Sequence, residues 1–449
     1  MKRTVLLLIL VAAGSLPACD YMHKQVRSDK EQKQAEDRDL RKGEMDLKDG
    51  KTFLAWDNYK YEGDIKNGKP HGKGVLYILD KDGRVINKIE GMFDNGMPVG
   101  VVDAYEYDSS GRLVGKFTGI LKNGKYEKGT LTTYRDNGTV AGTYTGTFEN
   151  NRPDGQGVLK TYDESGVIRI EYSGSFVGGK PEGKGILITY NKNGIIESKI
   201  EGTFFEGRPS GIADLYTYDK EGRLASKITG NYFKGSVNGN ATFITYDEQG
   251  REKTRYTGDA KEGKPGGAGT LITYNNDGSI LSKYTGEFKD GLPDGEGKLS
   301  THDKDGNIIQ EYAGQFKNGK PDGDGTQINY NDKGAVVGRY EGRFMEGLKN
   351  GDGTLHTFDD KGKLIKKYIG EFSGDKREGQ GSEFVYNQNR AIVRKYLGMY
   401  LNDKETGVGS IFTYGDNQVP ASQYLGQVIE GRPNGEGTLF TYDGNGRLT

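Results

Sequence analysis

From residue 59 onward, apolar and polar residues alternate in a pattern that repeats every 28 residues. Each copy is marked by a glycine that follows an aromatic residue or isoleucine by two positions. These glycines are Gly63, Gly91, Gly119, Gly146, Gly174, Gly202, Gly230, Gly258, Gly286, Gly314, Gly342, Gly370, Gly398 and Gly426. Only the step from Gly119 to Gly146 differs, at 27 residues. A fixed period of this kind indicates a tandem repeat, here of fourteen copies.

One copy, residues 284–311, shows the alternation clearly. Tyr284, Gly286 and Phe288 share one face of a first strand, because side chains two positions apart point the same way. In the second strand the same face is expected to carry Gly295, Gly297, Leu299 and Thr301. We expect a turn at residues 290–295. A second turn at residues 303–306 opens with Asp, which bonds nearby backbone, and ends with Gly at positive φ.

Short connections of this kind join strands that pair with each other in sequence order. A sheet of about 28 strands would ordinarily curl or split, but a solenoid avoids this because each hairpin contacts only its neighbours. The sequence therefore predicts an all-β fold. Its form is an elongated single-layer antiparallel β-sheet solenoid of tandem 28-residue β-hairpin repeats over residues 59–449.

Aromatic residues and glycines form a ladder along this sheet. The position two before the marker glycine is aromatic in eleven copies, and the position two after it is apolar in all. We expect a neighbouring ring to lie flat over each glycine. Representative ladder residues are Tyr172, Gly174 and Phe176, then Tyr284, Gly286 and Phe288, then Tyr312, Gly314 and Phe316. A second row on the opposite face is Tyr in eleven copies, with Leu79, His302 and Phe358 in the others.

Departures from the repeat are the places where we expect function. The turn at residues 125–129 is one residue short, and Glu383 replaces the usual Leu. Arg390 and Gln418 replace the glycine of the second turn, which should leave those turns strained or rebuilt. The last strand, residues 438–443, has no complete copy after it and is expected to offer an open edge for pairing.

The first residues resemble the signal of a bacterial lipoprotein. Lys2 and Arg3 precede an apolar run at residues 4–14, which is short for a membrane span. Residues 16–19, Leu-Pro-Ala-Cys, then resemble a lipobox, so we expect cleavage after residue 18 and lipidation of Cys19. The alternative is an ordinary secretory signal with a chance cysteine. Cys19 is the only cysteine in the chain, which excludes internal disulfides.

Localisation follows from this signal. We expect a lipid-anchored protein of the bacterial cell envelope, and Asp20 after the lipidated cysteine favours the inner membrane facing the periplasm. Of residues 20–50, 17 of 31 are charged with both signs mixed. Residues 19–58 are therefore predicted to be a charged tether.

Composition narrows the function classes. The chain has 72 glycines and 29 tyrosines but only 33% hydrophobic residues, which fits a turn-rich sheet without a thick core. Its 63 Lys and Arg balance 64 Asp and Glu, so the basic surface that nucleic-acid binding needs is missing.

Sites for metals, cofactors or catalysis are not expected. The four histidines, His23, His71, His302 and His356, show no paired ligand or catalytic spacing. The turns at residues 80–83 and 303–306 resemble the start of a calcium loop but lack its remaining oxygen ligands. The sequence predicts a protein that is not an enzyme and holds no cofactor.

The segment Tyr-x-Gly-x-Phe-x-x-Gly-x-Pro-x-Gly-x-Gly-x-Leu resembles the MORN (membrane occupation and recognition nexus) repeat. It stands as YEGDIKNGKPHGKGVL from Tyr61, YSGSFVGGKPEGKGIL from Tyr172 and YAGQFKNGKPDGDGTQ from Tyr312. The period is longer than usual for the family, and Val102, Ala213 and Ala241 replace the second-strand glycine. The resemblance implies an extended antiparallel sheet that serves as a scaffold, a partner-binding groove or a dimerisation surface.

Together these patterns predict a membrane-anchored envelope scaffold, a protein-binding repeat rod without catalytic activity. Its expected partners are envelope proteins, with a homodimer through a sheet edge or face as a further possibility, and the membrane through the N-terminal lipid. One alternative is a surface adhesin that binds glycans or lipid headgroups through exposed aromatic ladders. Another is an antitoxin or immunity-type MORN protein.

Overall fold

The computed structural model describes residues 46–48, 51–56, 58–415 and 418–449. Every regular element among them is a β-strand, and the strands pair antiparallel, so the predicted fold class is confirmed. The chain divides into two units, Met1–Ser236 and Val237–Thr449. Each unit is an open sheet in its own right. The described residues contain no helix with the length and apolar character needed to cross a membrane.

In the first unit each strand pairs with the next one along the chain. The strands are β1 (Asp46–Lys48), β2 (Lys51–Trp56), β3 (Tyr59–Lys66), β4 (Lys69–Leu79), β5 (Val85–Asp94), β6 (Met97–Tyr107), β7 (Leu113–Lys122), β8 (Lys125–Tyr134), β9 (Val140–Glu149), β10 (Arg152–Tyr162), β11 (Ile168–Val177), β12 (Lys180–Tyr190), β13 (Ile196–Phe205), β14 (Arg208–Tyr218) and β15 (Leu224–Phe233).

The second unit continues the same order of pairing. Its strands are β16 (Ser236–Tyr246), β17 (Glu252–Lys261), β18 (Lys264–Tyr274), β19 (Ile280–Lys289), β20 (Leu292–His302), β21 (Ile308–Lys317), β22 (Lys320–Tyr330), β23 (Val336–Met345), β24 (Leu348–Phe358), β25 (Leu364–Ser373), β26 (Lys376–Tyr386), β27 (Ile392–Leu401), β28 (Lys404–Tyr414), β29 (Pro420–Ile429) and β30 (Arg432–Thr441).

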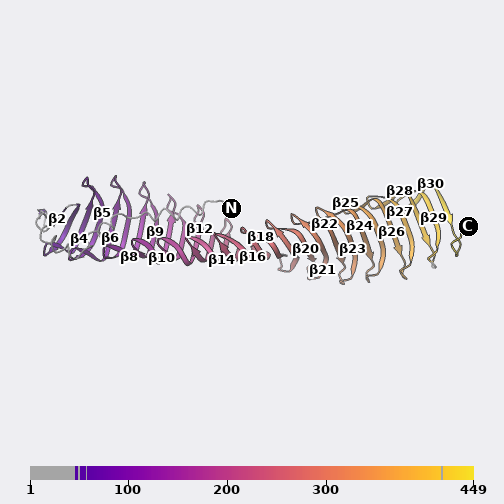
Figure 1. Ribbon diagram of the computed structural model, residues 1–449, viewed down its shortest axis with the longest axis horizontal. Coiled ribbons are helices and arrows are strands. Elements are labelled where there is room, and N and C mark those ends of the chain that lie inside the picture. Colours follow the sequence, from indigo (N-terminus) through magenta and orange to yellow (C-terminus); the bar gives the residue numbers. More distant parts are fainter. Residues whose placement is uncertain (1–45, 49–50, 57, 416–417) are drawn as a thin grey trace, which may run out of the picture. The chain divides into compact units, whose positions relative to one another are not determined.

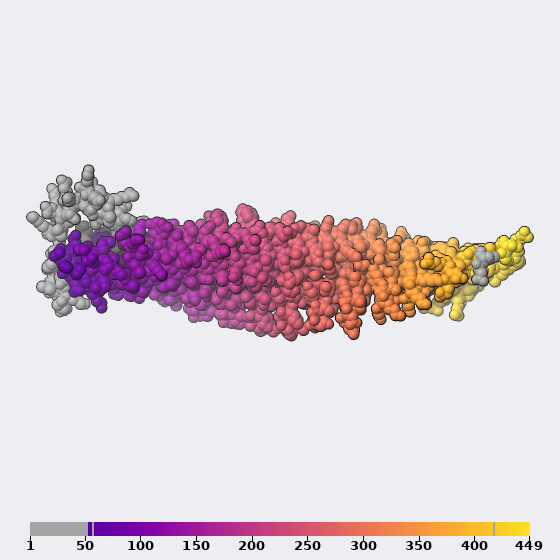
Figure 2. All heavy atoms as spheres, turned by 90° about the horizontal axis from the view of Figure 1, so that it is seen from below, coloured from indigo at the N-terminus to yellow at the C-terminus, as the bar shows by residue number. Residues whose placement is uncertain are grey.

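The sequence order of the strands is also their spatial order within each unit. In the ribbon view of the second unit, the colour advances along the row of strands and reaches yellow at β30 (Figure 1). In the space-filling view, colour advances steadily within each unit, so strands that are close in sequence are close in space (Figure 2). This arrangement is the one expected for a repeat array in which each hairpin contacts its neighbours.

The first turn of each copy is shorter than predicted. In the copy at residues 284–311 it consists of Asp290 and Gly291 alone, with φ of 53° and 94°, and β20 already begins at Leu292. Positive φ at both central residues defines the type I′ turn, whose twist matches a two-residue hairpin. The predicted turn at residues 290–295 was therefore too long.

The remaining residues of that predicted turn form a bulge inside β20. Gly286 pairs with Gly297 while Phe288 pairs with Pro293, so three residues of β20 lie opposite Glu287 alone. Gly295, at φ 108°, lies in this bulge, and a Cβ there would be 3.0 Å from the Cβ of Glu287. Because the bulge shifts the register, Pro293 pairs with Phe288, whereas Gly295 pairs with Phe316 of β21.

The second turn follows the sequence prediction. The Asp303 carboxylate accepts hydrogen bonds from the backbone N–H groups of Asp305 and Asn307, both at 2.9 Å, and Gly306 has φ 84°. Arg390 and Gln418 keep the same geometry at φ 62° and 63°. Those two turns are therefore strained and not rebuilt, because a non-glycine residue occupies the left-handed region.

Two strands lie inside the segment predicted to be a tether. β1 and β2 occupy part of residues 46–56, and β2 pairs with β3, with Leu54 opposite Tyr61. Leu54 is buried there, so apolar packing extends the sheet into this segment. The predicted tether boundary at residue 58 was therefore too late. Cys19, Asp20, His23 and the signal at residues 1–18 lie outside the described residues.

Candidate functional site

The core of each unit is one face of its sheet, called here the tyrosine face and defined by residues equivalent to Tyr284, Phe288 and Leu299. In the first unit its buried cluster runs from Leu54 to Phe204, and in the second from Tyr256 to Val428. The opposite face, called the charged face, carries residues equivalent to Lys283, Thr285 and Glu287. Because side chains alternate along a strand, the two faces have separate chemistry.

On the tyrosine face each tyrosine covers glycines of its own hairpin. A Cβ added at Gly297 would lie 2.3 Å from the Tyr284 hydroxyl, and one at Gly286 would lie 2.5 Å from it. That hydroxyl donates a hydrogen bond to the carbonyl of Glu287 at 3.0 Å, and burial raises the pKa of Tyr284 to about 12. The ring over the glycine thus belongs to the same hairpin, not to a neighbouring one as predicted.

The rings of this row meet edge to face and are not stacked flat. The ring centroid of Tyr284 lies 5.1 Å from that of Phe288 in its own strand and 4.7 Å from that of Phe316 in the next copy. The interplanar angles are 84° and 76°. Tyr312 and Tyr172 repeat both contacts with their own phenylalanine neighbours. Edge-to-face pairs contribute about 0.5–1.5 kcal/mol each beyond area burial, so the row stabilises successive hairpins against each other.

Burial of this row determines what it can bind. Tyr172, Tyr284 and Tyr312 are 1–3% exposed, and Phe176, Phe288 and Phe316 are 1–5% exposed. Such rings have no free surface for a sugar or a headgroup. Ligand stacking on this row, which the glycan-binding alternative needs, is therefore disfavoured.

The second aromatic row lies on the charged face and is half-buried. Tyr190 donates to Glu171 at 3.3 Å, and Tyr330 donates to Glu311 at 2.9 Å. In the same row, His302 has a buried ring nitrogen without a hydrogen-bond partner. These tyrosines therefore act as donors to carboxylates of the charged face.

A cluster of charged residues interrupts the tyrosine face in the second unit. Glu383 is 5% exposed, and its Oε2 accepts from Arg377 Nη1 at 2.5 Å. Glu405 is 8% exposed and accepts from Arg394 Nη1 at 2.7 Å, with the Tyr400 hydroxyl 3.4 Å from its Oε1. The hydrogen bonds to Glu405 raise the pKa of Arg394. Each buried carboxylate thus has a guanidinium partner, which buried charges require.

The sequence pointed to Glu383 but not to its partners. The missed signal is at the second residue after the first turn, which is proline in most copies. Three successive copies replace that proline with Lys349, Arg377 and Glu405. Because the charges of the cluster neutralise one another, it is a structural network with no unpaired carboxylate for a ligand.

Residues 125–129 lie inside β8 and not in a turn as predicted, because the missing residue shortens the bulge of that strand and leaves the two-residue turn before it unchanged. Tyr126 takes the place of the usual proline and stacks on Phe117, with ring centroids 4.0 Å apart and an interplanar angle of 16°. Tyr126 is 8% exposed. An aromatic contact therefore takes the place of the usual proline, and this part of β8 presents no open aromatic surface.

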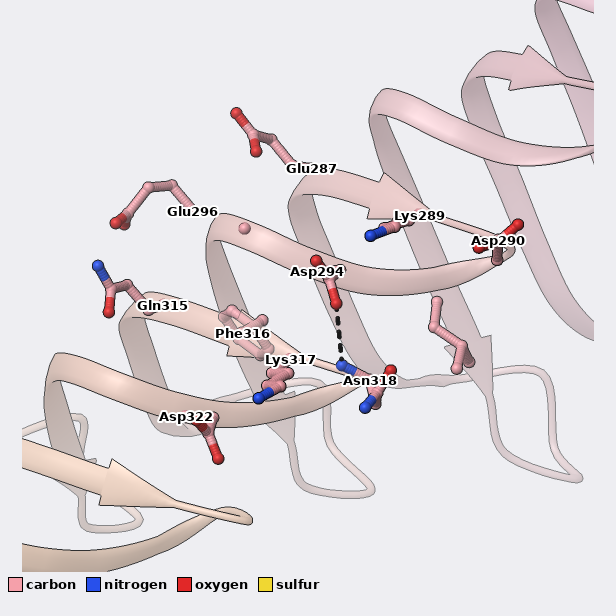
Figure 3. A pocket seen from close by; sticks show the side chains of 12 residues that line it. Glu287, Lys289, Asp290, Asp294, Glu296, Gln315, Phe316, Lys317, Asn318 and Asp322 are labelled. Carbon is pink, nitrogen blue, oxygen red and sulfur yellow. Dashed lines mark hydrogen bonds between the residues drawn. The ribbon is translucent and has the colours of Figure 1, made fainter.

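A hollow of about 670 Å³ lies at the first turns of the second unit (Figure 3). Glu287, Asp294, Glu296 and Asp322 line it, but the Asp294 carboxylate accepts from the backbone N–H of Asn318 at 3.3 Å. Hydrogen bonds of this kind connect the first turn of one copy to the first turn of the next copy. No three His, Cys, Asp or Glu side chains gather as metal ligands would anywhere in the described ranges.

The hairpins, the paired glycines and the tyrosine row together define a class, the tandem β-hairpin repeat proteins. The family model of the MORN repeat matches eight of the copies, so this chain carries MORN repeats. The matched segments are residues 61–80, 144–165, 172–193, 284–305, 312–331, 340–359, 368–385 and 424–446.

Comparison with whole proteins adds little. No curated protein matches the chain. The crystal structure of TcdB2-TccC3-TEV is 12% identical with a TM-score of 0.17, covering 92% of this chain and 24% of that one. A Photorhabdus luminescens Tc holotoxin pore is 11% identical with a TM-score of 0.15, covering 87% and 25%. This chain thus spans about a quarter of either, and TM-scores this low support no inference.

Proposed function

We propose that the protein is a membrane-anchored scaffold of the bacterial cell envelope that binds protein partners along its repeats and has no catalytic activity. Its partners would be envelope proteins, with self-association through a sheet face or edge as a second mode. MORN repeats suggest a protein-binding or membrane-associated role. To this general role we add three specific features: a lipid anchor at Cys19, location in the cell envelope, and binding through one face of the sheet.

The main support is the charged face, where pairs of a basic residue and glutamate recur at the same register in several copies. Lys60 and Glu62, two positions apart on one strand, form an ion pair with an N–O distance of 3.1 Å. Lys199 and Glu201 form the equivalent pair at 2.8 Å. Tyrosine rings lie beside such pairs. The ring centroid of Tyr105, for example, is 4.2 Å from Lys88 Nζ. Many similar surfaces on one chain give avidity to a partner that contacts several of them.

Cys19 supplies the anchor in this proposal. Cys19→Ser removes the thiol that would be lipidated, so the protein should move from the membrane fraction to the soluble periplasmic fraction. Metabolic labelling with an alkyne fatty acid and cell fractionation measure this. Labelling of the Cys19→Ser variant at the wild-type level would contradict the lipoprotein assignment.

Partner binding is tested on the full-length protein in living cells. A photoreactive residue placed at Thr285 on the charged face should crosslink to envelope proteins, whereas one at the buried Phe288 should not. Light scattering after size-exclusion chromatography then determines whether the protein also associates with itself. A monomer with no crosslinked partner at any charged-face position would refute the scaffold.

A further inference from the structure

The charged face changes character in the last copies of the second unit. Where earlier copies carry Glu62, Glu90, Glu201 or Glu341, successive late copies carry Ile369, Leu397 and Leu425. Ile369 is 43% exposed and Leu425 47%, and the neighbouring Val408 is 67% exposed. Apolar side chains therefore form a row on a face that is polar at the equivalent positions of most other copies.

Two lysines of these late copies have no acidic partner. The lysine two positions before the replaced glutamate is retained as Lys367 and Lys395. In earlier copies such a lysine pairs with that glutamate, as Lys88 does with Glu90 at 2.8 Å. Among the described residues, no carboxylate lies within ion-pairing distance of Lys367 or Lys395. Lys395 Nζ instead lies 5.4 and 5.7 Å from the rings of Phe384 and Phe412.

The apolar row borders a shallow groove of about 470 Å³. Its floor is made of Gly381, Gly398 and Gly409, which the tyrosine rings on the other face require to be glycine. A partner can therefore approach the backbone closely between the apolar side chains. Lys367 and Lys395 lie on the same face, two residues before Ile369 and Leu397, so lysine side chains flank one side of the apolar row.

The spacing of the row indicates the shape of its ligand. Equivalent residues of successive copies are two strands apart, or roughly 9.6 Å at about 4.8 Å per strand. Seven residues of an α-helix advance about 10.5 Å, whereas residues on one side of a β-strand repeat every ~6.7 Å. A helix lying across the strands thus places an apolar residue on each copy, and acidic neighbours meet the lysines.

We propose that this groove binds an acidic amphipathic helix of a partner protein, with apolar residues at seven-residue spacing flanked by carboxylates. The inference rests on the proposed scaffold function and assigns it a site and a ligand chemistry. Apolar contact would supply most of the affinity, as in other helix-in-groove interfaces. The lysines would select acidic helices over basic ones.

The probe is a synthetic helical peptide of three heptads, with Leu at every seventh position and Glu beside it, titrated into the full-length protein by fluorescence anisotropy. Leu397→Ser and the double variant Lys367→Glu, Lys395→Glu should each weaken binding at least about tenfold, which is about 1.4 kcal/mol. Lys199→Glu, at the equivalent position of the first unit, is the matched control and should leave binding unchanged. A peptide with Lys in place of Glu should bind only the double variant.

Equal binding of the two peptides to the wild type, no binding, or binding that survives Leu397→Ser would overturn the proposal. Release of a dimer by Leu397→Ser would also overturn it, because the occupant would then be a second copy. Circular dichroism of each variant checks that substitution at these half-buried positions leaves the sheet intact. If envelope proteins still crosslink at Thr285 while the groove fails, the scaffold function stands without this site.

Discussion

In three of the five copies that lack the proline, the backbone N–H at that position donates to a side chain of the next turn. Lys349 N donates to the Asp375 carboxylate at 3.0 Å, Arg377 N to Asp403 at 2.9 Å, and Tyr126 N to Asn151 at 2.9 Å. Each acceptor is at positive φ in the next turn, where glycine is usual. Apart from glycine, Asn and Asp adopt this conformation most readily. In each of these copies the hydrogen bond to the backbone N–H therefore offsets the strain of a non-glycine residue in the turn. Val237 and Glu405 replace proline without such an acceptor, because glycine occupies the acceptor position in both cases.

This pairing predicts a specific coupling between Asp375 and Lys349. Asp375→Ala removes the acceptor and should lower the free energy of unfolding by about 1–3 kcal/mol. In a Lys349→Pro background the N–H is already absent, so the same change should cost less. A double-mutant cycle measured by urea unfolding gives the coupling energy, and additive effects would contradict this assignment.

The partly buried carboxyl of Glu106 is expected to make the free energy of unfolding depend on pH. Burial raises the pKa of this carboxyl above its ordinary value of 4.5, so the folded state disfavours its ionised form. Its contribution to stability is fully present below the unfolded pKa and is lost as pH rises through the folded pKa. Glu106→Gln should therefore stabilise the protein at about pH 7 but not below pH 4.5, by denaturant unfolding at both. A gain that is equal at both pH values would exclude this cause.

At the scale of the hairpin, ring and glycine depend on each other. The three copies that carry Ile in place of the aromatic residue, at Ile89, Ile200 and Ile228, are the three that carry Val102, Ala213 and Ala241 in place of the second-strand glycine. In the first unit a Cβ added at Gly202 would lie 2.4 Å from the Ala213 Cβ. A side chain at that position excludes the tyrosine ring, so the two substitutions occur together.

The tyrosine–glycine pair predicts a rescue. Gly297→Ala places a methyl group against the Tyr284 ring and should destabilise the sheet by about 1–3 kcal/mol, as overpacking does. Adding Tyr284→Ile reproduces the natural alternative and should recover part of that loss. Thermal unfolding of the two single variants and the double variant measures it. Lys298→Ala, adjacent to Gly297 but on the charged face, is the control. If the double variant loses as much stability as the two single variants added together, steric exclusion is contradicted.

For the whole chain, strand pairing between sequence neighbours predicts that damage stays local. Within each unit an inner strand pairs with the one before and the one after it, as β20 does with β19 and β21. Repeat arrays of this kind unfold in local units. Gly297→Ala should therefore increase hydrogen exchange in β19 to β22 and leave β9 to β12 unchanged, measured by mass spectrometry. Equal loss of protection in both segments would indicate global cooperativity.

Much of this structure could be predicted from the sequence. The alternation around Tyr284 and the turn residues Asp303 and Gly306 are local signals, and both led to the correct strands and second turn. The first turn was predicted too long because Pro293 and Gly295 are typical of loops. Only the pairing of Phe288 with Pro293 shows that they belong to a bulged strand. The contact partners of Glu383 were missed because they come from three different strands, β25, β26 and β27.

The sequence by itself determined the period, the hairpins, the order of pairing and the two chemically distinct faces, because these depend on residues close together in the chain. It also contains the linked substitutions of glycine and tyrosine. Only the tertiary structure decided that the rings are buried edge to face and that Glu383 and Glu405 are neutralised by Arg377 and Arg394. It also showed an apolar groove on the face that carries Lys367 and Lys395. Those properties depend on contacts between successive hairpins, which no single copy of the repeat encodes.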